Sequence, residues 1–214
     1  SAIVSSTDLS YQSISIVTDT LITKKLENSF AKLATVALVV EVAILFISYL
    51  LFPEVEDTFR HAARYSGRLS AVLFLFVFFL YSRSYPLPLS GNPRVKKMVK
   101  LFALVHVIHW LFLAASVYLN YVSLETVKVI GGSLAYAMIV AAPFLLHQVN
   151  FKFQLVYFYY VSLVMILTWL ARIKGDFQGA SPSWIHYVLM GTTIGCCAYF
   201  GWQMRKKAVL HAKH

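Results

Sequence analysis

The sequence predicts an all-α integral membrane protein, a bundle of six transmembrane helices with both termini in the cytoplasm. Of its 214 residues, 59% are hydrophobic and 13% are charged, whereas soluble domains average roughly 45–50% and about 25%. The mean hydropathy of +0.68 agrees, because a chain of this length cannot bury so much apolar surface in one aqueous core. The composition therefore excludes a soluble globular domain.

Six apolar segments are long enough to cross a bilayer, which takes about 20 residues of helix. Polar or Pro- and Gly-rich stretches separate them, most clearly residues 82–97 with Pro86, Pro88 and Pro93. We expect transmembrane helices near residues 31–52, 67–85, 98–121, 126–147, 153–173 and 184–204. Residues 31–205 are therefore expected to form one transmembrane domain.

Two polar segments flank this domain. Residues 1–30 are rich in Ser and Thr and lack the apolar run of a signal peptide. Within them Ile14, Val17 and Leu21 fall roughly on one helical face, which favours a helix lying in the membrane interface, with a partly ordered tail as the alternative. Residues 206–214 form a basic tail suited to anionic lipid.

The distribution of basic residues predicts the orientation. The chain has 19 Lys and Arg against 9 Asp and Glu, a formal net charge of +10. In a membrane protein this excess indicates cytoplasmic loops rather than nucleic-acid binding. With six spans most basic residues, including Lys24, Arg94 and Arg205, fall on the side of the termini. The positive-inside rule places that side in the cytoplasm.

Two histidines stand well inside the third apolar segment. His106 and His109 are spaced by three, which puts both imidazoles on one helix face close to mid-membrane. A neutral imidazole inside a bundle is a natural axial ligand for haem iron. The alternative is that both are hydrogen-bonded packing residues.

Glu41 lies at the middle of the first apolar segment. A carboxylate cannot face lipid there, so we expect Glu41 to face the bundle and to pair with His106 or His109, with Ser70 and Thr193 as other candidates. A Glu–His contact would orient the ring, as in many haem and metal sites. A proton relay and a structural hydrogen bond are the rival interpretations.

Arg60, Arg64 and Arg68 are spaced by four at the entrance to the second helix, with His61 and Tyr65 beside them. They lie on the predicted outer side, against the topological preference. Guanidinium groups hold carboxylates and phosphates in bidentate geometry, so this row could bind haem propionates, a lipid headgroup or an anionic substrate. The alternative is a solvated face whose positive charges compensate the nearby acidic residues, which are Glu54, Glu56 and Asp57.

No motif of hydrolysis, phosphoryl transfer or zinc chemistry occurs in the sequence. Cys196 and Cys197 are adjacent inside an apolar run, so they give no disulfide framework. We expect no flavin or nicotinamide domain in this chain, and any electrons would therefore come from a partner.

Three stretches resemble the ferric-reductase-like transmembrane domain family, most closely its small bacterial members: residues 60–68, residues 92–109 with the two histidines, and residues 130–136. The resemblance implies a b-type haem protein in the bacterial inner membrane, with iron ligands from the third and fifth helices. This chain departs from the family because residues 152–174 contain no histidine. The departure excludes the usual two-haem ligation.

A single haem could still lie between His106 or His109 and another histidine, for which the candidates are His61, His147 and His186. The function expected from the sequence is a haem b protein that moves electrons within the bilayer, taking them from quinol or a partner protein. The alternatives are a non-catalytic membrane subunit of a larger complex, favoured by the small-residue face at Gly131 and Gly132, and a small transporter.

Overall fold

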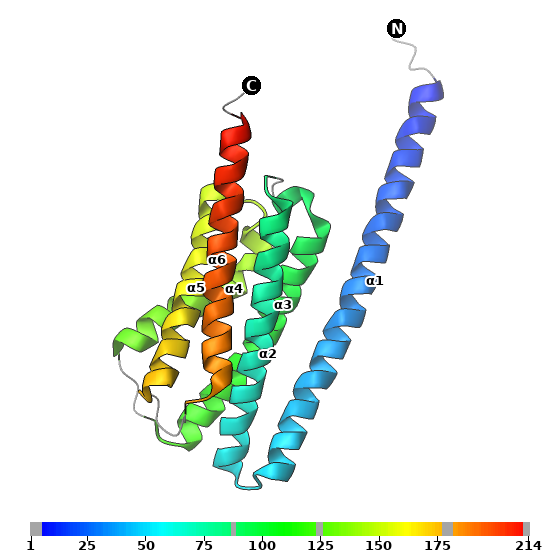
Figure 1. Cartoon of the computed structure of the whole chain (residues 1–214). Coiled ribbons are helices and arrows are strands. Elements are labelled where there is room, and N and C mark those ends of the chain that lie inside the picture. Colours follow the sequence, from blue (N-terminus) through cyan, green and yellow to red (C-terminus); the bar gives the residue numbers. More distant parts are fainter. Residues whose placement is uncertain (1–5, 87–88, 123–125, 177–181, 212–214) are drawn as a thin grey trace.

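The computed structural model describes residues 6–86, 89–122, 126–176 and 182–211, and within them the chain is all-helical, as predicted (Figure 1). A short 3-10 turn, Leu89–Gly91, precedes the third helix. The six α-helices are α1 (Ser6–Leu51), α2 (Val55–Ser84), α3 (Pro93–Leu119), α4 (Thr126–Leu145), α5 (Phe151–Lys174) and α6 (Trp184–His211).

Several helices extend beyond the apolar spans predicted for them. α1 is one continuous helix of 46 residues, and its part that is apolar enough to cross a membrane, Asn28–Leu51, agrees closely with the predicted span of residues 31–52. α2 begins at Val55, well before residue 67. Its polar first turns are helical because Glu56 and Asp57 suit the positive end of the helix dipole, and because Asp57 and Arg60 form an ion pair three residues apart.

Among the residues that the structure describes, four helices are long and apolar enough to cross a membrane: α1 from Asn28, α2, α3 and α5. α4 contributes a shorter apolar stretch, Val129–Leu145. In Figure 1 the start of α1 and the end of α6 lie at the same end of the bundle. The six-span topology and the cytoplasmic side of the termini stay predictions.

The outer surface of α1 is suited to lipid rather than to water. Val39, Phe46 and Leu50 are each about 60% exposed (63%, 60% and 62%), whereas Glu41 and Ser48 are buried. A helix that turns its apolar side chains outward and its polar ones inward is stable only where the surrounding solvent is apolar. α1 runs along one side of the bundle (Figure 1) and contacts α2 and α3.

An aromatic cluster fills the centre of the bundle. Phe74 and Phe78 of α2, Phe158 of α5 and Phe200 of α6 are fully buried, and Phe78 stacks on Phe158 with ring centroids 5.0 Å apart. Tyr81 also stacks on Phe158, at 4.4 Å, and donates a hydrogen bond to the Gln154 side chain. These contacts hold α2 against α5 and α6.

Phe158→Ala should lower the free energy of unfolding by about 3 kcal/mol, because truncation of a buried ring leaves a cavity that the neighbouring rings cannot fill. Thermal unfolding of the purified protein in detergent measures the loss. Phe153→Ala is the control, since Phe153 is 62% exposed on the same helix. Equal losses for the two variants would contradict the assigned core.

Candidate functional site

Arg60 occupies the outer end of the arginine row on α2. Its guanidinium forms an ion pair with Asp57 and donates a hydrogen bond to the Asn120 side chain at the end of α3. Asn120 also donates to the Glu56 carbonyl. For Arg60, the interpretation as part of a charged surface paired with nearby acidic residues therefore holds. Its contacts attach the start of α2 to the end of α3.

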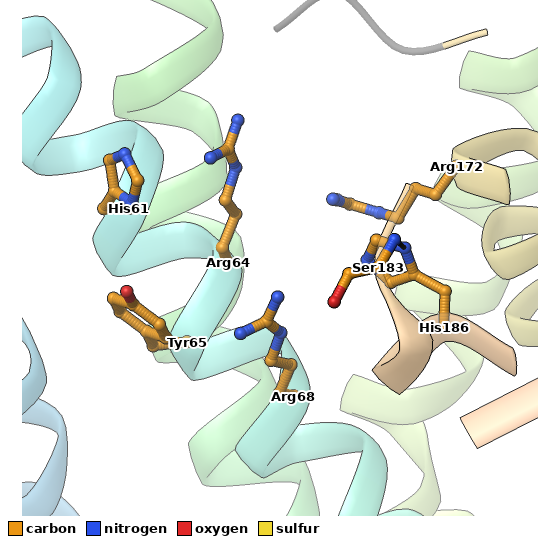
Figure 2. Close-up of a pocket in the computed structure, with 7 residues that line it drawn as sticks. All are labelled: His61, Arg64, Tyr65, Arg68, Arg172, Ser183 and His186. Atoms are coloured by element: carbon orange, nitrogen blue, oxygen red, sulfur yellow. Dashed lines mark hydrogen bonds between the residues drawn. The ribbon is translucent and has the colours of Figure 1, made fainter. Parts of the chain in front are cut away.

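Arg64 and Arg68, one and two turns further along α2, line a cavity of about 200 Å³. Figure 2 shows their guanidinium groups on the side of α2 that faces Arg172 and His186. The cavity lies where α2 begins, α5 ends and α6 begins. Its lining consists of three arginines, two histidines, a tyrosine and a serine, namely Arg64, Arg68, Arg172, His61, His186, Tyr65 and Ser183.

Arg172, in the last turn of α5, and His186, in the first turn of α6, both line the cavity. α5 ends at Gly175, whose backbone is left-handed (φ 78°), a conformation that glycine adopts without strain. Before α6, the Ser183 N–H donates to His186 Nδ1 at 3.2 Å. The neutral His186 ring must then carry its proton on Nε2, which makes Nε2 a hydrogen-bond donor.

Ring contacts hold the lining side chains in place. His186 stacks on Trp169 of α5 with ring centroids 5.8 Å apart, and His61 stacks on Phe52 at 3.5 Å. The Arg68 guanidinium lies over the Tyr65 ring, 5.6 Å from its centroid. These ring contacts fix the orientation of four of the seven lining side chains.

The cavity concentrates positive charge. Arg172 interacts electrostatically with both Arg64 and Arg68, and like charges that share a partly buried site repel one another strongly. An oxyanion placed among the three would turn this repulsion into attraction and could accept bidentate hydrogen bonds. The arrangement is chemically that of an anion-binding site.

The sequence predicts only part of this lining. It groups His61, Arg64 and Arg68, and the structure has all three at one cavity. It does not predict Arg172 or Ser183 at the site, and it offers His186 as a candidate haem ligand and not as part of the arginine row. One signal was present for Arg172, because it lies on the predicted outer side, as the α2 arginines do.

Glu41 faces the bundle, as predicted, with 1% of its surface exposed. The predicted histidine partner is wrong, because Ser66 of α2 donates to Glu41 Oε1 at 2.9 Å and Oε2 has no hydrogen-bond partner. The other candidates also make different bonds: Ser70 contacts His106, and Thr193 donates to the Leu189 carbonyl of its own helix. Glu41 therefore attaches α1 to α2.

His106 and His109 lie on one face of α3, with ring centroids 5.5 Å apart. The Ser70 hydroxyl is 2.6 Å from His106 Nδ1, and Tyr136 of α4 stacks on the His106 ring at 4.6 Å. These contacts are those of a packed, hydrogen-bonded imidazole that joins α2, α3 and α4.

His109 packs directly against the backbone of α2. A Cβ at Gly67 would lie 2.8 Å from His109 Cε1, so only glycine leaves room for the ring. A backbone hydrogen bond joins His109 to Ala63. The Nδ1 atom is buried and has no hydrogen-bond partner. Nδ1 is therefore enclosed where α3 packs against Gly67 of α2.

His106 and His109 alone do not form a two-sided haem site. His106 and His109 face the same side of one helix, so they cannot be opposite axial ligands of one iron. His147 lies in the turn after α4, at the opposite end of the bundle from His61 and His186. Across the part of the chain that the structure describes, no group of three or more His, Cys, Asp or Glu side chains could hold a metal ion. Haem binding stays a prediction, and no electron-transfer step is derived from it.

No family model matches the chain, and no curated protein or solved structure is found to be similar to it. The likeness to ferric-reductase-like transmembrane domains therefore also stays a prediction. The functional conclusion has to rest on the geometry of the cavity.

Gly67→Ala should destabilise the fold by about 1–3 kcal/mol, because its methyl group overlaps the His109 ring. Added to His109→Ala, the same change should cost much less, since the smaller side chain removes the overlap. Thermal unfolding of the two single variants and the double variant measures this coupling. Gly191→Ala on α6 is the control, as its Cβ would meet nothing within 4 Å; additive effects at Gly67 and His109 would contradict the contact.

Proposed function

We propose that this chain is an integral membrane protein that binds an anionic group, a phosphate or a carboxylate, in the arginine-lined cavity at one end of its helix bundle. The observation that carries the proposal is the convergence of Arg64 and Arg68 from α2 with Arg172 from α5 on one cavity. Residues far apart in the chain meet there, so the charge is not the property of one helix face.

The donors around the cavity suit an oxyanion. Three planar guanidinium groups offer hydrogen bonds in a fixed fork that matches carboxylate and phosphate oxygens. His186 Nε2 is a further donor, since its Nδ1 accepts from the Ser183 backbone. Binding would place negative charge among three positive groups in a site of reduced dielectric, where charge-assisted hydrogen bonds are strong.

Inorganic phosphate should raise the melting temperature of the detergent-purified protein by about 3 °C at roughly ten times its dissociation constant, since a ligand of the folded state stabilises it by mass action. Chloride at equal ionic strength should not. Arg68→Gln should reduce the rise to about 1 °C or less at the same phosphate concentration, because one charge-assisted contact accounts for about tenfold or more in affinity.

The matched control is Arg83→Gln, near the other end of α2, where the guanidinium lies over Phe79. This variant should keep the full phosphate response. If Arg68→Gln and Arg83→Gln respond to phosphate as the unaltered protein does, the cavity is not the anion site.

Haem b, predicted from the sequence, has a separate test. Full-length protein expressed with ample haem and purified in detergent should show a Soret band that shifts on reduction with dithionite. His109→Ala should remove this band if His109 is an iron ligand. Colourless protein would contradict the haem prediction and leave the anion site untouched.

A further inference from the structure

Exposed aromatic side chains mark the end of the bundle that contains the cavity. Trp184 and Tyr187, on the first turn of α6, are 74% and 54% exposed and stand on either side of His186 in the chain. Tyr118 and Tyr121, at the end of α3, are 81% and 93% exposed. Trp and Tyr with exposed rings gather where membrane meets water, because their rings are amphipathic.

Contacts tie these aromatic residues to the level of the cavity. Asn120, between Tyr118 and Tyr121, is bonded to Arg60 and to the Glu56 carbonyl at the start of α2. Trp184 is two residues from His186, which lines the cavity. The exposed aromatic residues at the end of α3 and the start of α6 thus lie at the same end of the bundle as the cavity, the end that the headgroups of a bilayer would surround.

The arginine row runs inward from that level. Arg60, the outermost, pairs with Asp57. Arg64 and Arg68 follow at intervals of about 6 Å along the helix, which is four residues at about 1.5 Å each. With the apolar helices across a bilayer, the cavity lies just below the headgroups, where lipid phosphates are abundant anions.

We propose that the anionic group bound in the cavity is the phosphate-monoester headgroup of an anionic lipid, with its acyl chains left in the bilayer. This inference rests on the proposed anion site and adds the source of the anion. A phosphate monoester carries about −1.5 to −2 charges at neutral pH, whereas a phosphodiester headgroup carries one. Three guanidinium groups converging on one cavity match the higher charge.

The test compares ligands that share the phosphate but differ in source. The full-length protein is reconstituted in nanodiscs of phosphatidylcholine containing a small fraction of phosphatidate or of phosphatidylglycerol, and bound lipid is counted by native mass spectrometry. Inorganic phosphate and glycerol 3-phosphate are titrated against the protein in phosphatidylcholine alone. We expect phosphatidate to bind at least tenfold more tightly than phosphatidylglycerol and than either soluble phosphate.

Variants separate site binding from general charge attraction. Arg68→Gln should reduce phosphatidate binding tenfold or more, whereas Arg83→Gln near the other end of α2 should leave it unchanged. Loss of binding in both variants, or equal binding of the two anionic lipids, would overturn the headgroup assignment in favour of unspecific charge.

The two proposals fail differently. If the soluble phosphates bind as tightly as phosphatidate and Arg68→Gln abolishes both, the anion site stands and its lipid source is wrong. If neither lipid nor soluble phosphate binding responds to Arg68→Gln, the proposed function itself is wrong.

Discussion

The meeting of three guanidinium groups at one end of the bundle is the constraint that organises this structure. Arg64, Arg68 and Arg172 interact electrostatically around a cavity of about 200 Å³. Their mutual repulsion opposes the packing of α2 against the end of α5, which the buried aromatic cluster near the middle of the bundle holds together. The fold thus keeps a positive site open at its edge by means of apolar contacts deeper in its interior.

α2 can serve this site because its two sides have different chemistry. At about 100° per residue, Ser66 and Ser70 fall on the side opposite Arg64 and Arg68, and Ala63 and Gly67 lie between the two sides. Gly67 packs against His109 of α3, Ser66 donates a hydrogen bond to Glu41 of α1, and Ser70 contacts His106 of α3. One segment of two turns therefore lines the cavity on one side and anchors two helices on the other.

Composition and hydrophobic periodicity were sufficient to predict the helical fold and the inward position of Glu41. Apolar runs predicted an all-helical chain, and the cost of a charge in lipid predicted that Glu41 faces the bundle. Helix boundaries were harder to predict. The first turns of α2 are polar, so in the sequence they resemble a loop, and only the structure shows that their arginines line a cavity. The prediction of a histidine partner for Glu41 was wrong, because no local sequence pattern shows whether Ser66 of α2 or a histidine of α3 lies next to Glu41. Arg172 and Ser183 escaped prediction because they are far from the α2 arginines in the chain, and only the packing of α6 against α2 and α5 brings them to the cavity.

The most direct test of this account is the melting temperature of Arg68→Gln in phosphate-free, delipidated detergent at low ionic strength. If the cavity exists to hold an anion, removing one of three like charges relieves repulsion, and the variant should melt at the same temperature as the unaltered protein or higher. A melting temperature several degrees lower would contradict the account, because Arg68 would then be a structural side chain whose charge the fold itself already neutralises.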